Sequence, residues 1–430
     1  MSTDAPMDHS TFINMIKKTA LCSLVAAAAS TLSVGAHAQS SVTLYGIIDA
    51  GLAYTSNVQT GRSNGALHGS SQYSLQDGST TGVTGSRWGL RGTEDLGNGL
   101  SAIFTLENGF GIGTGATAIG GGEFARQAWV GMKSNQYGTV SLGRQYDAIA
   151  TFVQPLSSVG SWAGIMTGHA SDMDNLGNTR RSNNSIRYSS PNYAGFTVGG
   201  VYEFGGVAGD VSQRQVYSIG TAYAQGPLAL GAAYLNARNP NYSFYGSNAN
   251  AGTALTSNNL GSIGSATTAE VSPQFAGYAS AHTLQIIAVG GTYKIGAATL
   301  DLVYTNTQFQ QIGNTLSGPN TFGYSGTAKF DNAEAGVSYR LKPDFLVGVV
   351  YNYTHGSAAT GQASGSIYHQ AAAGFDYNLS TRTDIYGDVV YLHAGGTDSL
   401  NQSAVAAITG QTASASNHQV AVHLSLRQRF

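Results

Sequence analysis

The chain is built from short segments in which apolar and polar residues alternate. In the first of them, Val42, Leu44 and Ile48 fall on one face, whereas Thr43 and Asp49 fall on the other. Alternation of this kind predicts a β-strand with one apolar face. Sixteen such segments follow one another, at residues 41–55, 85–95, 100–110, 124–134, 138–146, 183–190, 195–204, 214–224, 227–237, 282–294, 297–308, 328–341, 345–355, 367–378, 382–393 and 418–430. We therefore expect an all-β protein.

The connectors between these segments are short and long in turn. Residues 96–99 and 225–226 are short connectors, whereas 56–84, 147–182 and 238–281 are long ones. A barrel that crosses a membrane has tight turns at one end and long loops at the other. A soluble sandwich is the alternative, but its sheets would have edges that need protection, whereas closure removes edges and satisfies every backbone group. The pattern predicts a 16-stranded antiparallel transmembrane β-barrel.

Composition narrows the class of protein further. Charged residues make up 10% of the 430 residues, against about 25% in an ordinary soluble domain. A hydrophobic content of 42% argues against disorder. Residues 215–237 carry no charge, yet Gly226-Pro227 at their centre favours two strands and a turn over a membrane-spanning helix. A typical soluble enzyme and a helical membrane protein are both disfavoured.

The N-terminus has the pattern of an export signal. Lys17 and Lys18 precede an apolar stretch, and Ala36-His37-Ala38 offers small residues at the two positions that a signal peptidase reads. We expect residues 1–38 to be removed. Met15 is the alternative start of translation, because it would give a signal of ordinary length.

Residues 39–430 are expected to form one barrel domain without cofactors. The single cysteine of the chain, Cys22, falls in the signal, which leaves no thiol for disulfides or metal sites. Asp172-Met-Asp174-Asn-Leu-Gly177 resembles a calcium loop but has Leu and Asn at two ligand positions. Gly111-Ile-Gly113 matches a dinucleotide fingerprint without the helix that must follow it. No catalytic, cofactor or metal residue and no nucleic-acid partner is expected.

Four motifs and the terminal residue suggest a family. The motifs are Val42-Thr-Leu-Tyr-Gly-Ile-Ile-Asp49, Ser86-Arg-Trp-Gly-Leu-Arg-Gly-Thr-Glu-Asp-Leu-Gly97, Arg126-Gln-Ala-Trp-Val-Gly131 and Gly138-Thr-Val-Ser-Leu-Gly-Arg-Gln-Tyr146, and the chain ends on Phe430. Together they resemble the general porins of β-proteobacteria. The resemblance implies a homotrimer in the outer membrane of a Gram-negative bacterium. It also implies that the third external loop, here 147–182, folds into the lumen as a constriction.

Charged residues that would line this constriction follow from the resemblance and the alternation together. In the family, arginines of the wall face acidic groups of the constriction loop. Arg87 and Arg91 share a face opposite Trp88 and Leu90, whereas Arg144 falls on an apolar face and is set aside. The candidates are therefore the wall residues Arg87, Arg91, Arg126, Arg187 and Glu107 and the loop residues Asp147, Asp172 and Asp174.

The expected function is a water-filled channel for passive diffusion of small hydrophilic solutes and ions, with outer-membrane lipid around it. The wall arginines suggest a weak preference for anions. Three alternatives stay open: a channel dedicated to one class of solute, an outer-membrane barrel enzyme, and a plugged structural barrel. Barrel enzymes generally use fewer strands, so catalysis is not expected, and ion conductance would exclude a plugged barrel.

Overall fold

The computed structural model describes residues 40–118, 121–246 and 256–430, and the expected export signal 1–38 lies outside them. All strands belong to one sheet. They are β1 (Ser41–Ser63), β2 (Ala66–Asp77), β3 (Arg87–Gly97), β4 (Leu100–Gly109), β5 (Gln127–Ser134), β6 (Gly138–Gln145), β7 (Ser182–Ser189), β8 (Phe196–Glu203), β9 (Val216–Gln225), β10 (Leu228–Arg238), β11 (Thr283–Ile295), β12 (Ala298–Ile312), β13 (Gly326–Lys342), β14 (Phe345–Ser357), β15 (Ser366–Asn378), β16 (Thr383–Gly396) and β17 (His418–Arg429).

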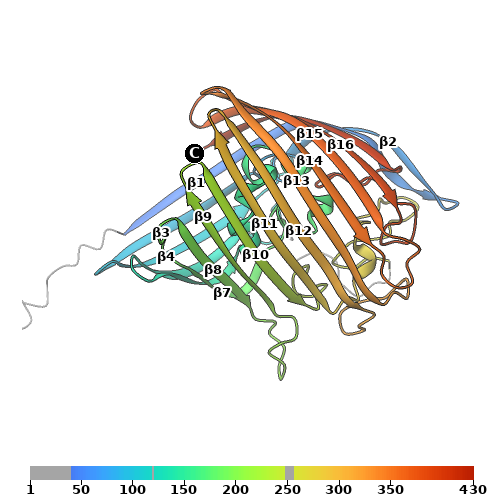
Figure 1. Cartoon of the computed structure of the whole chain (residues 1–430), viewed down its shortest axis with the longest axis horizontal. Coiled ribbons are helices and arrows are strands. Elements are labelled where there is room, and N and C mark those ends of the chain that lie inside the picture. Colours follow the sequence, from blue (N-terminus) through green and yellow to red (C-terminus); the bar gives the residue numbers. More distant parts are fainter. Residues whose placement is uncertain (1–39, 119–120, 247–255) are drawn as a thin grey trace, which may run out of the picture.

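Each strand from β3 to β17 pairs antiparallel with the next, and β17 pairs with β1, so the sheet closes on itself (Figure 1). The strands β2 and β3 share one position in the wall. β3 pairs with residues 41–47 of β1, and β2 pairs with residues 50–63 of the same strand. Seventeen strands therefore fill sixteen positions, which confirms the sixteen-stranded barrel.

The hairpin of β1 and β2 was not foreseen, because residues 56–84 were expected to be a loop. Figure 1 shows this hairpin reaching past the neighbouring strands at one end of the barrel. Most side chains of β2 are exposed. Large apolar residues alternate in this strand only at Tyr73 and Leu75, which are 80% and 60% exposed, so the pattern is too short to indicate a separate strand.

The wall is apolar outside and polar inside. In β14, Val349 and Tyr351 are 52% and 46% exposed, whereas Asn352 and Thr354, on the opposite face further along the strand, are each 2% exposed. Apolar side chains on the outside and hydrogen-bonded polar groups inside are the reverse of a soluble protein's arrangement. It is the arrangement that a bilayer demands.

Short turns join the strands at one end of the barrel. The uncharged stretch 215–237 forms the hairpin of β9 and β10, with Gly226 at a φ of +57° in its turn, which confirms two strands rather than a helix. Among residues 40–118, 121–246 and 256–430, no helix combines the length and the apolar character that crossing a membrane would require.

The connector between β6 and β7 folds into the barrel, as expected for the third external loop. We call residues 146–181 the inner loop. It contains α2 (Ala148–Phe152), η1 (Gln154–Leu156), α3 (Ser158–Ser161), η2 (Ile165–Thr167) and η3 (Ala170–Asp172). A further short helix, η4 (Ala276–Tyr278), belongs to the connector between β10 and β11. Ile149, Val153 and Met166 of the inner loop are completely buried. Its apolar residues therefore pack against the wall instead of meeting water.

Glycines of the wall make room for α2. A Cβ atom at Gly231 of β10 would lie 2.1 Å from the carbonyl oxygen of Phe152, and one at Gly220 of β9 would lie 2.5 Å from the Phe152 ring. The inner loop thus rests directly on backbone at these two positions. A larger side chain there has no space unless the loop moves toward the lumen.

Replacing Gly231 by leucine should therefore displace the inner loop. We expect a lower single-channel conductance, together with a loss of about 1–3 kcal/mol of stability from overpacking. Ala232→Leu is the matched control, because Ala232 is the next residue of β10 and faces outward. Conductance in planar bilayers and the temperature of unfolding measure the two effects. Equal conductance of both variants would contradict this packing.

Candidate pore constriction

The carboxylates of the inner loop hold the loop together. Asp147 is completely buried and caps α2, because it accepts hydrogen bonds from the backbone of Ala150 at 2.9 Å and from Asn175 at 2.6 Å. Asp172 accepts three, from the backbone of Gly177 at 2.6 Å and from the backbone and hydroxyl of Thr179 at 3.1 and 2.6 Å. Burial, and the nearby Asp174, raise the pKa of Asp172 to about 6.

The third carboxylate, Asp174, ties the inner loop to the wall. Its Oδ2 lies 2.5 Å from Nδ1 of His169 and also accepts a hydrogen bond from the hydroxyl of Thr305 on β12 at 2.5 Å. On the other side of the imidazole, Nε2 of His169 lies 3.7 Å from Oε2 of Glu334 on β13. Oε1 of Glu334 accepts a hydrogen bond from the backbone of Ser158 at 2.7 Å.

His169 is charged at neutral pH in this setting. Burial alone would lower the pKa of His169, but the carboxylates of Asp174 and Glu334 raise it to about 9. Burial alone would likewise raise the pKa of Asp174, and the imidazolium outweighs that effect and lowers it. A buried cation between two carboxylates therefore fastens the inner loop to the wall.

The structure corrects the expected role of the three loop carboxylates. Asp147, Asp172 and Asp174 were expected to face the lumen, but they are 0%, 3% and 0% exposed. Their oxygens are used by hydrogen bonds within the loop and to the wall. The same bonds occupy the oxygens that a calcium ion would need at Asp172 and Asp174. Within the described ranges, no group of three or more His, Cys, Asp or Glu side chains is arranged to hold a metal ion.

Two of the wall arginines share one carboxylate. Arg126 donates from Nε to Oε1 of Glu107 at 2.7 Å, and Nη1 of Arg87 lies 3.7 Å from the same oxygen. The hydroxyls of Tyr45 and Tyr146 also donate to Glu107, at 2.9 and 3.2 Å. Glu107 is 3% exposed and lies beneath the guanidinium groups. Arg87, Arg126 and Glu107, three of the residues expected at the constriction, therefore lie together, and two tyrosines that the sequence pattern does not mark complete the cluster.

A third guanidinium comes from the end of the inner loop. Arg181 precedes β7 and lies over the ring of Tyr146, 5.2 Å from its centroid. Burial lowers the pKa of Arg181 to about 10, so the side chain stays positive at neutral pH. Arg181 falls within the expected loop 147–182 and is not among the expected constriction residues. Its position directly before a wall strand was the available signal.

A cavity of about 320 Å³ lies between the inner loop, residues 78–85 of the connector that joins β2 to β3, and the neighbouring wall. Its charged lining consists of Arg87 and Arg126 of the wall and Arg181 of the loop, and the described lining contains no carboxylate. The opposite side is formed by uncharged residues of the inner loop, among them Val159 and Ile165. The described lining of this cavity therefore carries three guanidinium groups, and Glu107 pairs with two of them, Arg87 and Arg126.

Two expected arginines lie apart from this cavity. Arg91 is exposed on β3, with its guanidinium 5.2 Å from the ring centroid of Tyr45. Arg187 is half-buried on β7. Neither residue belongs to the cavity lining. Arg144, which was set aside, donates from Nε to the carbonyl of Ala125 at 2.6 Å and also stays outside the lining.

Comparison with known proteins places the chain in a family. Residues 23–397 match the Gram-negative porin family. The chain is 31% identical over 383 residues to an outer membrane porin protein of Bordetella pertussis, covering 84% of this chain and 91% of that one. It is 30% identical over 422 residues to outer membrane porin protein 32 of Delftia acidovorans, covering 95% and 99%.

A solved structure has the same fold. The anion-selective porin from Comamonas acidovorans matches with a TM-score of 0.64 and 24% identity, covering 91% of this chain and all of that chain. At this identity the likeness concerns the barrel alone.

Proposed function

Because the chain belongs to the Gram-negative porin family and forms a water-filled outer-membrane channel for small hydrophilic solutes, we propose that its constriction favours anions over cations. One observation carries the proposal: Arg87, Arg126 and Arg181 line the cavity beside the inner loop, and none of the loop carboxylates Asp147, Asp172 and Asp174 belongs to that lining. The residues of the constriction are these three arginines with Glu107 beneath them.

The field of the arginines extends across the passage. At about 0.15 M salt the screening length is about 8 Å, which is comparable to the width of a cavity of about 320 Å³. An ion in this cavity therefore lies within the field of the arginines. The preference is weak because Glu107 offsets part of the charge and the passage is wet.

The reversal potential in a KCl gradient across a planar bilayer tests the proposal. We expect the sign of the reversal potential to correspond to a higher permeability for chloride than for potassium. The preference should shrink when the mean concentration is raised from about 0.1 M to about 1 M, because the screening length falls from about 10 Å to about 3 Å. A cation preference, or a ratio independent of salt, would contradict the proposal.

Three further points rest on the family resemblance and on the sequence. We infer that the protein is a homotrimer, as the family suggests, and that the barrel domain begins at residue 39 after removal of the signal 1–38. We also infer that it has no catalytic activity, because its relatives at 30–31% identity are named as porins. Diffusion through the constriction requires no bond to be made or broken.

A further inference from the structure

A row of imidazoles crosses the outer face of the barrel. The antiparallel register places Tyr353 of β14 opposite His369 of β15, His369 opposite His393 of β16, and His393 opposite His418 of β17. The ring centroids of Tyr353 and His369 are 5.1 Å apart, and those of His369 and His393 are 6.5 Å apart. We call His369, His393 and His418 the histidine row.

The histidine row lies toward the end of the barrel that carries the long loops. The hydrogen bonds found for these side chains use one nitrogen of each ring. Nδ1 of His369 pairs with the hydroxyl of Tyr351 at 2.7 Å, Nε2 of His393 with Asn417 at 3.3 Å, and Nδ1 of His418 with Asn417 at 3.2 Å. The second nitrogen of each ring is thus left for a ligand outside the wall.

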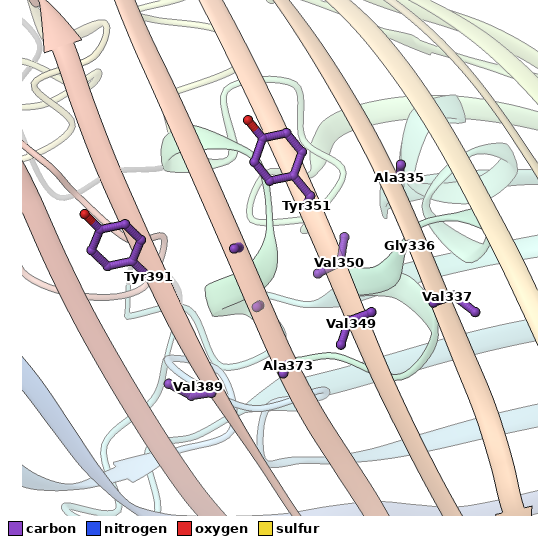
Figure 2. Close-up of a pocket in the computed structure, with 11 residues that line it drawn as sticks. Ala335, Gly336, Val337, Val349, Val350, Tyr351, Ala373, Val389 and Tyr391 are labelled. Carbon is purple, nitrogen blue, oxygen red and sulfur yellow. The ribbon is translucent and has the colours of Figure 1, made fainter.

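An apolar groove lies directly below the histidine row. Ala371 of β15 is small and lies between Tyr351 of β14 and Tyr391 of β16, and the equally small Ala373 lies between two valines of the same strands. The groove has a volume of about 600 Å³. Figure 2 shows the two tyrosines on either side of it, with their hydroxyl groups pointing the same way. An apolar groove in a wall that faces the bilayer is filled by hydrocarbon.

The two features are adjacent in the register. Ala371 pairs with Tyr391, and Ala373 pairs with Val389. His369 lies two residues before Ala371 and therefore on the same face of β15. A ligand that fills both must be apolar at one end and must accept hydrogen bonds at the other. Imidazole N–H groups suit a phosphate oxygen, and the bond is charge-assisted.

Other charged groups near the row fit an anionic partner. His355 lies two residues beyond Tyr353 on β14, and the exposed Lys329 of β13 pairs with Ser357. The nearest carboxylate in the register is Asp331, opposite His355, and it already accepts hydrogen bonds from Tyr304 at 2.6 Å and Asn306 at 2.8 Å. The outer face above the groove therefore offers mainly hydrogen-bond donors to a ligand.

We propose that the outer face of β13–β17 binds one phosphate-bearing lipid of the outer leaflet, with an acyl chain in the groove and the phosphate on the histidine row. The proposal depends on the location of the barrel in the outer membrane and not on its ion preference. It assigns a role to three of the ten histidines of the chain, which the channel itself does not use.

Native mass spectrometry of the protein in detergent, titrated with dipalmitoyl phosphatidic acid or with dipalmitoylglycerol, tests the proposal. His369→Gln with His393→Gln should lower binding of phosphatidic acid relative to diacylglycerol by about ten-fold, because two charge-assisted donors are lost. Ala371→Leu with Ala373→Leu should lower binding of both lipids by about ten-fold, because the side chains fill the groove. These positions face outward, so the barrel should fold normally.

The controls are His68→Gln, on the exposed hairpin of β1 and β2, and Ala232→Leu, on the outer face of β10. Both should bind the two lipids like the unchanged protein. The proposal fails if the groove variant matches the Ala232→Leu control, or if the histidine variant loses both lipids equally. It also fails if inorganic phosphate displaces bound phosphatidic acid as effectively as further phosphatidic acid does. A groove variant that changes only the number of chains in the assembly, and not lipid binding, would likewise contradict it.

Discussion

Replacing Arg87, Arg126 and Arg181 together by glutamine is expected to abolish the anion preference and turn it toward cations. The three side chains supply all the charge of the cavity lining, and Glu107 would remain beneath it without a counter-charge. A unit charge about 4 Å away contributes about 1 kcal/mol even in water. The permeability ratio of chloride to potassium should therefore fall by about ten-fold or more. Reversal potentials in a KCl gradient measure it.

Two variants control this result. Arg382→Gln removes a charge from an exposed turn outside the barrel interior and should leave the ratio unchanged. Glu107→Gln removes the carboxylate that pairs with Arg87 and Arg126 and should raise the anion preference. An unchanged ratio in the triple variant would show that ions do not pass beside these arginines.

Replacing His169 by glutamine is expected to loosen the inner loop. The imidazolium lies between Asp174 and Glu334 at 2.5 and 3.7 Å, and all three side chains are buried. Removal of one partner from a buried ionic group costs about 3–5 kcal/mol, because the remaining charges lose their compensation. We expect a lower unfolding temperature and large current fluctuations in single-channel records. His68→Gln, on the exposed hairpin, should change neither.

The same group makes loop attachment depend on pH. The pKa of His169 is raised to about 9 in the folded protein from its ordinary value of about 6.5. A raised pKa of a base means that the stabilisation is complete below about pH 6.5 and is lost as the pH rises through about 9. Current fluctuations should therefore increase between pH 7 and pH 10 in the unchanged protein. In His169→Gln they should be high throughout, and a parallel rise in both proteins would contradict the role of His169.

The strands of the barrel could be predicted because the bilayer imposes a simple rule. Each strand that meets lipid must alternate, so residues such as Val349 and Tyr351 on one face and Asn352 on the other reveal it. β2 was missed because the hairpin extends past its neighbours and its large apolar residues alternate only at Tyr73 and Leu75. The alternation therefore predicts the strands of the membrane wall but not the part of the hairpin that extends beyond it.

Arg87 and Arg126 line the cavity and Glu107 pairs with them, whereas the other two wall candidates, Arg91 and Arg187, and all three loop candidates lie outside its lining. Arg87, Arg126 and Glu107 lie on strands or directly beside one, where alternation tells which side chains face inward. Asp172 and Asp174 lie in an irregular loop, whose backbone decides which way each side chain points. Their burial depends on contacts with Thr179 in the loop and with Thr305, 131 residues away on β12. No local pattern encodes such a contact.

His169 was missed for the same reason. Its partners Asp174 and Glu334 are 5 and 165 residues away in the chain, at no spacing that marks a known site. The three-dimensional path of the inner loop brings them together. The sequence of a loop therefore shows which charged residues it contains but not which partners they contact.

The position of ions in the constriction tests the central claim most directly. Crystals of the protein soaked in sodium bromide and in caesium chloride would show each ion by its anomalous scattering. We predict a bromide in the cavity between Arg87, Arg126 and Arg181 and no caesium there. Caesium in that cavity, beside Glu107 and without bromide, would contradict the account.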